Sequence, residues 1–341
     1  MRAKVKKEIY SLNSLKAICC IIVILFHCPL PGFWGSLICY FLRFPVPSFF
    51  MISGYFCTFE NQAYRHRIIE TIKYIVFGEM FYVVVKVILA LMHGGNPFDI
   101  ILIEMSFPIF VRKILFGTFY NGPLWFLYAL LWTWTLFWGF SSICQRKGIK
   151  ISIRLQRIVV SGLLATLIFG WMICQYVTNI NDWIWIFRSC VLFAVPFVWI
   201  GKYIKRFEQE LLEKFNPKVC LIAIFGAYVM ALFEVLLAYR HSIAHEIYLS
   251  TVFIAFFVFL LMLHFQGQHQ TILSRMGKNY SAYVYICHGA CIRIVESIGV
   301  GGGIKPILVI ILSLAFAVLC HNTRRMLRRF SIRINNSRRK K

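Results

Sequence analysis

The residues best suited to chemistry lie in the first apolar block of the chain, a lysine and a histidine. Lys16 precedes His27 by eleven residues, which is about three helical turns, so both side chains project from one helix face about 16 Å apart along its axis. An imidazole can take up or release a proton near neutral pH, as general acid–base catalysis requires. A single histidine near the end of an apolar block is, however, more often a structural residue.

Further ionisable residues lie inside other apolar stretches. Placing such a group in a bilayer costs about 2.5–3.5 kcal/mol, so it usually faces a bundle interior or a water-filled cavity. Their positions in the middle or outer part of the predicted helices predict a cavity open to the outside, with Lys16 near a second, cytosolic opening. The structural alternative is an interhelical ion pair, such as Lys86 with Glu234, or snorkelling to the interface. These residues are Arg43, Lys86, Arg188, Glu234, His288, Arg293 and Glu296.

The composition places these residues in a membrane protein. Of 341 residues, 60% are apolar and 15% are charged, whereas a soluble domain has about a quarter charged residues. The apolar residues form blocks of about 20, enough to cross a hydrocarbon core about 30 Å thick. The formal net charge of +24 could indicate nucleic-acid binding, but the basic residues lie between the blocks and at the chain ends. Membrane lipids are therefore the expected partners, and no nucleic acid is expected.

Hydropathy and turn signals predict an all-α, polytopic transmembrane helical bundle of about ten spans. The positive-inside rule then places both termini in the cytosol, because few basic residues fall in the outer loops. A membrane domain at residues 1–323 precedes a basic cytosolic tail at 324–341, and residues 98–118 are interfacial or re-entrant. The basic start of the chain is not expected to be a cleaved signal peptide. The predicted spans are 12–30, 33–58, 69–92, 122–144, 157–178, 183–201, 218–239, 245–265, 279–297 and 305–322.

The twelve cysteines indicate neither disulfides nor a metal site. Several lie within apolar blocks, among them Cys19, Cys20 and Cys287, and no Cys-x-x-Cys or Cys/His ligand spacing occurs. They are expected to pack as small apolar side chains. No metal is expected.

Four motifs together resemble the acyltransferase 3 family of integral-membrane O-acyltransferases. In that family a basic residue precedes a histidine with ten residues between them, and the next span has a phenylalanine-rich Ser-Gly-aromatic motif. The fourth span begins with Trp-x-Leu, and a late Gly…Ser motif ends in Tyr-x-x-His. Four motifs in this order are more specific than any one of them. Here they are Lys16 to His27, Phe49-Phe50-Met51-Ile52-Ser53-Gly54-Tyr55, Gly122-Pro123-Leu124-Trp125-Phe126-Leu127, and Gly277 to His288.

The resemblance implies a stand-alone membrane O-acyltransferase with no fused extracytoplasmic domain. Its reaction would move an acyl group, most often acetyl, from cytosolic acyl-CoA (acetyl-CoA) to a hydroxyl of a sugar or cell-envelope polysaccharide. The implied location is the bacterial inner, or cytoplasmic, membrane. Acyl transfer to a hydroxyl needs a base for the alcohol proton and a cation or dipole that stabilises the oxyanion.

The resemblance also implies roles for individual residues. His27 is the catalytic base, and Lys16 would hold a phosphate or the pantetheine region of CoA. Close helix packing explains Ser53 and Gly54 better than a serine nucleophile does, and interfacial anchoring and helix packing are alternatives for Trp125 and His288. The residues implied in donor or substrate binding are Lys16, Arg43, Ser53, Tyr55, Trp125, Tyr285 and His288. The basic residues that would supply charge for the nucleotide phosphates are Arg65, Arg67, Lys73, Arg146, Lys147 and Lys150.

Three features depart from the family pattern. Lys16 stands where arginine is usual, which keeps the charge but loses the bidentate fork. Asn13 stands where aspartate is common, and one additional residue separates Gly277 from Ser281.

Two other classes of function are compatible with buried charges. A transporter or flippase for a polar or lipid-linked envelope precursor would also place charges at mid-membrane, but it would be expected to show inverted repeats or matching broken helices, and the sequence shows no such halves. A membrane sensor or scaffold would need no buried histidine. Donor use discriminates between the first two, because only an acyltransferase consumes acyl-CoA. No oligomeric state is predicted.

The charge distribution generates a topology prediction. Labels at His66, at Lys147 and in the C-terminal tail should react only from the cytosolic side, and a label at His241 only from the outside. Accessibility of single introduced cysteines to a membrane-impermeant reagent measures this. Cytosolic labelling at position 241 would contradict the ten-span arrangement.

Overall fold

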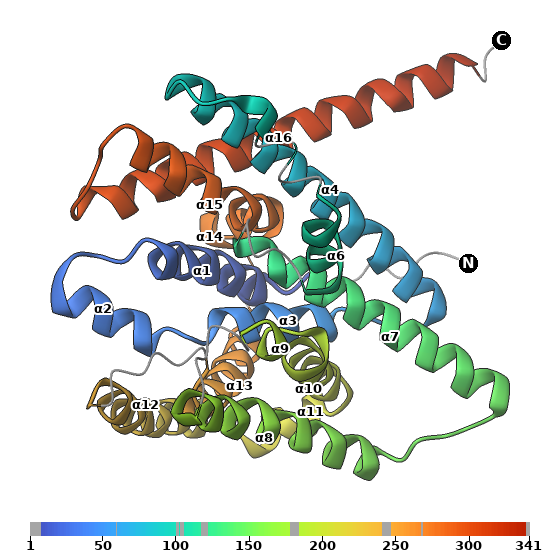
Figure 1. Cartoon of the computed structure of the whole chain (residues 1–341). Helices are drawn as coiled ribbons and strands as arrows, with labels where there is room; N and C mark the ends of the chain where they lie inside the picture. Colours follow the sequence, from blue (N-terminus) through green and yellow to red (C-terminus); the bar gives the residue numbers. More distant parts are fainter. Residues whose placement is uncertain are drawn as a thin grey trace.

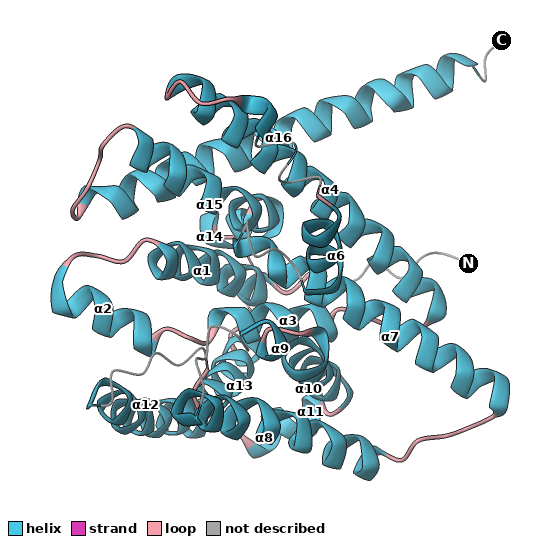
Figure 2. Ribbon diagram, viewed as in Figure 1, coloured by secondary structure: helices cyan, strands magenta, loops and turns pink. Residues whose placement is uncertain are grey.

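The computed structural model describes residues 8–58, 60–99, 102, 106–116, 122–177, 184–240, 247–266 and 269–338. Helices make up the regular structure of these residues, and no strand occurs among them (Figure 2). The predicted all-α fold is confirmed. His241 lies outside the described residues, as do residues 100, 101, 103–105, 117 and 118 of the 98–118 segment.

Within the described chain, seven segments are long and apolar enough to cross a membrane. They are α1 (Tyr10–His27), α2 with α3 (Gly32–Phe41 and Pro45–Tyr55), α4 (Asn61–Met92), α7 (Trp125–Lys147), α8 (Ile153–Val177), α12 (Pro217–Arg240) and α16 (Ile304–Arg338). The other three predicted spans correspond to shorter or interrupted helices, namely α9 (Ile184–Phe187) with η3 (Cys190–Ala194) and α10 (Val195–Arg206), α13 (Leu249–His264) and α15 (Ser281–Ser297). Short helices α6 (Phe107–Phe116), η1 (Gly122–Leu124), α11 (Glu208–Lys214) and α14 (Ile272–Asn279) complete the described set.

Two predicted spans are interrupted by backbone breaks. The span at 33–58 breaks at residues 42–44, where Pro45 and Pro47 follow. Proline has no amide hydrogen, so it can begin a helix but does not continue one. The span at 183–201 contains the π-helical turn η3, and Pro196 stands at the start of α10. The first break places Arg43 at the junction of α2 and α3.

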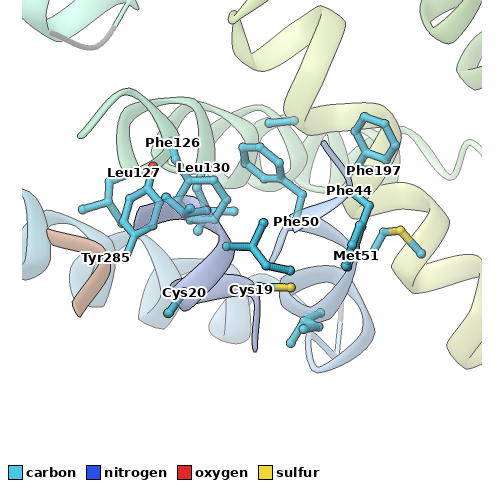
Figure 3. Close-up of a cluster of buried hydrophobic side chains, with 14 of the residues drawn as sticks. Cys19, Cys20, Phe44, Phe50, Met51, Phe126, Leu127, Leu130, Phe197 and Tyr285 are labelled. Carbon is cyan, nitrogen blue, oxygen red and sulfur yellow. The ribbon is translucent and has the colours of Figure 1, made fainter. Parts of the chain in front are cut away.

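Helix α1 lies at the centre of the packing. It contacts α3, α14 and α15, and Leu12, Leu15 and Cys19 are fully buried along it. Figure 3 shows Cys19 and Cys20 of α1 close to a cluster that contains Phe50 of α3 and Tyr285 of α15. In Figure 1 the start of α1 and the ends of α7 and α16 face the right-hand side of the bundle, whereas α2 lies at the left. The topology predicted from the positive-inside rule makes the right-hand side cytosolic, and the two ends of the bundle are named cytosolic and outer on that prediction.

Glycines allow close backbone contact where these helices cross. A β-carbon at Gly54 of α3 would overlap the carbonyl oxygen of Val198 in α10, and one at Gly201 of α10 would overlap the carbonyl oxygen of Met51 in α3. A β-carbon at Gly277 of α14 would likewise overlap the carbonyl oxygen of Asn13 in α1. Small residues permit such approach between membrane helices. The glycine of the Ser-Gly motif therefore has a packing role.

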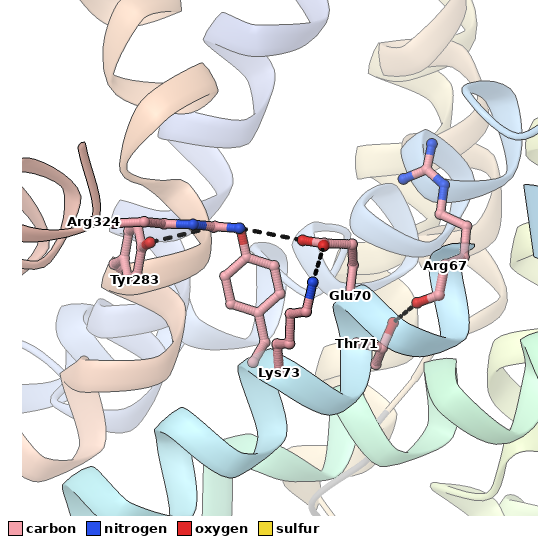
Figure 4. A network of polar contacts seen from close by, with 7 residues as sticks. Arg67, Glu70, Thr71, Lys73, Tyr283 and Arg324 are labelled. Atoms are coloured by element: carbon pink, nitrogen blue, oxygen red, sulfur yellow. Dashed lines mark hydrogen bonds and ion pairs between the residues drawn. The ribbon is translucent and has the colours of Figure 1, made fainter. Parts of the chain in front are cut away.

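A polar network attaches α16 to the rest of the bundle (Figure 4). Arg324 donates hydrogen bonds to Tyr74 of α4 at 3.1 Å and to Tyr283 of α15 at 3.4 Å, and it pairs with Glu70 of α4 at 3.3 Å. Glu70 also pairs with Lys73 at 2.8 Å. Helix α16 continues beyond Arg324 and projects away from the other helices (Figure 1).

Glu234 of α12 satisfies the first turn of α13. Its carboxylate accepts hydrogen bonds from the backbone amides of Leu249 at 3.0 Å and Ser250 at 3.2 Å, and from the Ser250 hydroxyl. Amide groups at a helix start have no partner within the helix and favour a negative charge. This contact accounts for the acid within α12, in place of the Lys86 ion pair considered from the sequence.

The α3–α10 crossing generates a stability prediction. Gly54→Ala should lower the free energy of unfolding by about 1–3 kcal/mol, because the new methyl group forces the two backbones apart. The control is Gly139→Ala in α7, where a β-carbon meets nothing within 4 Å, and it should be neutral or stabilise by up to about 1 kcal/mol. Thermal unfolding of the detergent-solubilised full chain measures both. Equal melting temperatures for the two variants would show that the crossing tolerates a side chain.

Candidate functional site

Two histidines from distant parts of the sequence meet at the outer end of α1. The ring centroids of His27 and His288 of α15 lie 5.2 Å apart, with the ring planes tilted by 37°. His27 is exposed, whereas His288 is fully buried. The pair therefore has one ring open to the surroundings and one held inside the bundle.

The hydrogen bonding of His288 defines which ring nitrogen can accept a proton. Nδ1 lies 2.7 Å from the carbonyl oxygen of Tyr285, and a carbonyl oxygen can only accept, so Nδ1 carries the hydrogen. In the neutral ring Nε2 then has a free lone pair. Nε2 is buried, and it has no hydrogen-bond partner among the described residues. The His288 ring is thus held as a hydrogen-bond acceptor inside the bundle.

The motifs that are separate in sequence come together around Tyr285. Its hydroxyl donates a hydrogen bond to the carbonyl oxygen of Pro123 in η1. Its ring lies 5.2 Å from that of Phe126 in α7, 6.0 Å from that of Phe49 in α3 and 5.7 Å from that of His288. All four motifs therefore contribute to one site.

An aromatic layer lies on the inner side of the two histidines. Phe50 and Phe126 have ring centroids 4.3 Å apart, and Trp125 packs on Phe193 of η3 at 5.5 Å. Figure 3 shows Tyr285, Phe126 and Phe50 in this layer. Arg188, beside the π-helical turn, has its guanidinium carbon 5.5 Å from the Trp125 ring, within range of a cation–π interaction. The layer is therefore buried and apolar, with a cation at its edge.

The break between α2 and α3 brings a second arginine to the outer end. The guanidinium carbon of Arg43 lies 4.2 Å from the ring centroid of Phe26, the residue before His27, and 5.9 Å from that of Tyr40. Arg43 is half-buried. Arg43 therefore lies next to the residue that precedes His27, and its substrate-binding role stays a prediction.

Lys16 belongs to a separate polar cluster at the cytosolic end of α1. Its ammonium donates to the side-chain oxygen of Asn13 at 3.2 Å, the Asn13 amide donates to Glu8 at 3.0 Å, and Lys278 pairs with Glu8 at 2.7 Å. An aspartate at position 13 could not donate to Glu8. The presence of Glu8 thus gives a physical reason for asparagine where the family commonly has aspartate.

A second cation is held close to this cluster. The Lys16 ammonium lies 5.4 Å from the Phe56 ring centroid, and Arg67 of α4 donates to the Phe56 carbonyl oxygen at 3.1 Å. Phe56, directly after α3, therefore contacts both Lys16 and Arg67, and the two cations lie at a similar depth along the bundle. The helical rise places this level about 16 Å from His27.

Two predicted binding residues are engaged in helix contacts. The Ser53 hydroxyl donates to the Phe49 carbonyl oxygen at 2.8 Å, within α3. Tyr55 is buried, and its hydroxyl donates to Glu208 of α11 at 2.9 Å and accepts from Lys205 of α10 at 3.3 Å. Tyr55 therefore lies near the cytosolic end, apart from the histidine pair.

Sequence reasoning did not assign four residues that the structure adds to the two ends. Arg188 and Phe126 belong to the aromatic layer, and Glu8 and Lys278 belong to the cytosolic cluster. For Arg188 the signal was present, because an arginine inside a span is costly and usually functional. Within the described residues, no group of three or more His, Cys, Asp or Glu side chains could hold a metal ion.

Comparison with known proteins identifies the family. The chain matches the acyltransferase 3 family, described as an acyltransferase domain, over residues 9–320. This match covers nearly the whole chain, so the protein belongs to the acyltransferase 3 family. It is a multi-pass membrane acyltransferase. Searches of curated proteins and of solved structures each found no match.

Proposed function

We propose that the protein is an O-acyltransferase of the bacterial inner membrane. It transfers an acyl group, most often acetyl, from cytosolic acyl-CoA to a hydroxyl of a sugar or cell-envelope polysaccharide on the outer side. The observation that carries this proposal is the exposed His27 ring, 5.2 Å from a buried His288 whose Nε2 can only accept in the neutral ring.

The two histidines have different roles in the proposed reaction. In the neutral ring of His27 one nitrogen carries a hydrogen and the other does not, and the second nitrogen takes the proton of the acceptor hydroxyl. The N–H of His27 would turn toward His288 Nε2, which has no hydrogen-bond partner in the part of the chain that the structure describes, and this contact would orient the ring. The hydroxyl oxygen then bonds to the thioester carbonyl carbon, and the carbon–sulfur bond breaks. The departing thiolate of CoA takes up the proton from His27. Arg188 is our candidate for stabilising the oxyanion, because it lies at the edge of the same buried, apolar layer.

The donor would bind at the opposite end of α1. Lys16 and Arg67, together with Lys278, place positive charge at the cytosolic end, where nucleotide phosphates arrive from the cytosol. The thioester arm would reach toward His27 beside the aromatic layer, which keeps water from the acyl group. Two polar ends with an apolar layer between them suit a donor and an acceptor on opposite sides of a membrane.

One observation favours transport as a second candidate. The interrupted helices α2–α3 and α9–α10 cross each other through Gly54 and Gly201, and broken helices commonly form transporter sites. Purified protein in vesicles with labelled acetyl-CoA and an envelope-glycan acceptor separates the two functions. Formation of a base-labile ester with release of free CoA supports acyl transfer, whereas movement of intact glycan without CoA release supports transport.

The cytosolic cluster generates a prediction for Lys16. Lys16→Arg should retain much of the activity, because charge and reach are kept, while Lys16→Ala should raise the KM for acyl-CoA or abolish turnover. Initial rates at several acyl-CoA concentrations measure this, with the exposed Lys218→Ala as the matched control. An unchanged KM and kcat in Lys16→Ala would remove Lys16 from the donor site.

The histidine pair generates a prediction for His27. His27→Ala should reduce ester formation by about 10²–10⁴-fold, the contribution typical of a positioned base. His27→Gln keeps polarity but cannot take up a proton at neutral pH, so it should be nearly as inactive. Ester formed per folded molecule from labelled acyl-CoA is the measurement, and the exposed cytosolic His66→Gln is the control. Activity of His27→Gln close to that of the parent would exclude a general-base role.

A further inference from the structure

An apolar groove lies between α7 and α8 at the cytosolic end of the bundle. It has a volume of about 520 Å³ and is lined by Phe137 and Phe140 of α7, Val159 of α8, and Trp199 and Lys202 of α10, among others. Trp199 of α10 donates a hydrogen bond to Gln156 of α8 at 3.0 Å. This bond links two of the helices that line the groove. We call this feature the α7–α8 groove.

The α7–α8 groove is open toward the surroundings of the bundle. Phe140 and Val159 line it and are exposed, and both belong to membrane-length helices, so their exposed surfaces face hydrocarbon. Along α7 the lining runs from Phe137 to Cys144, for which the helical rise gives about 10 Å, a third of a hydrocarbon core about 30 Å thick. The groove therefore lies within one leaflet.

The cytosolic rim of the groove is strongly basic. Residues 146–157, which end α7, form the connecting loop and begin α8, contain five exposed Lys or Arg residues and no acid. Figure 1 shows this loop joining α7 to α8 at the right-hand side of the bundle. Half-buried Lys202 adds a cation inside the groove itself. Clustered basic residues directly cytosolic of membrane helices attract anionic headgroups. The five rim residues are Arg146, Lys147, Lys150, Arg154 and Arg157.

From this combination of an apolar groove and a basic rim, we propose that the α7–α8 groove binds one acyl chain of an anionic phospholipid from the inner leaflet, with its phosphate on Lys202 and the rim. The lateral opening favours a lipid over the acyl donor, because a lipid tail can enter from the bilayer without crossing water. An acetyl group would leave most of a 520 Å³ groove empty. The proposal gives Arg146, Lys147 and Lys150 a lipid phosphate in place of the nucleotide phosphates that the resemblance implied, and it does not require the acyl-transfer function.

Photolabelling of the full chain in phosphatidylcholine nanodiscs tests the proposal. The probe is a trace amount of phosphatidylglycerol with a photoreactive group in the middle of one acyl chain, and labelled peptides are mapped by mass spectrometry. The label should fall on residues 137–144 and 155–160. Val159→Trp fills the groove and should reduce labelling there by at least about fivefold, whereas Ile158→Trp, on the exposed neighbouring position outside the lining, should not.

Charge variants and a second probe complete the test. Lys202→Gln should reduce labelling by phosphatidylglycerol, and the exposed Lys218→Gln should not. Equal labelling by a photoreactive phosphatidylcholine would overturn the anionic headgroup, and labelling unaffected by Val159→Trp would overturn the groove as the site. Displacement of the lipid label by palmitoyl-CoA, but not by added phosphatidylglycerol, would assign the groove to the donor and overturn the lipid proposal. Because no turnover is measured, these results do not depend on the proposed reaction.

Discussion

The burial of α1 between α3, α14 and α15 is the constraint on which the rest of the site depends. Lys16 and His27 stand on this single helix, so their separation is set by the helical rise and not by loop conformation. The backbone of α14 reaches α1 directly at Gly277 and Asn13, and α15 places His288 beside His27. Each end of α1 therefore has a fixed partner, and helices far apart in the sequence converge on it.

The aromatic layer between the two ends gives them different chemical environments. Phe49, Phe50, Phe126 and Tyr285 pack ring against ring in the middle of the bundle, and electrostatic interactions are stronger in such an apolar medium than in water. In the proposed reaction, Arg188 at the edge of the layer would therefore act on a developing negative charge more strongly than it would in water. His27 is exposed at one end of α1, whereas Lys16 belongs to the polar cluster at the other end.

The bilayer places a further constraint on the interrupted helices α2–α3 and α9–α10. Broken backbone is tolerated at membrane depth only where it is buried in protein or lines a cavity. Here the helices that follow the two breaks, α3 and α10, cross closely at Gly54 and Gly201. The breaks themselves place Arg43 beside Phe26 and Arg188 beside Trp125. The prolines that interrupt the helices therefore also deliver cations to the site.

The amino-acid sequence by itself determined that the chain folds into membrane helices, because apolar blocks in lipid must satisfy their backbone groups internally. It also determined the spacing of Lys16 and His27, since a helix has a fixed rise, and the order of the four motifs indicated the family. Only the tertiary structure decided that Tyr285 binds Pro123 and that Glu234 caps α13. It also decided that Asn13 links Lys16 to Glu8 and that Tyr55 binds Glu208 near the cytosolic end. These contacts join residues distant in sequence, and they depend on how side chains interlock at helix crossings, which hydropathy and local spacing do not encode.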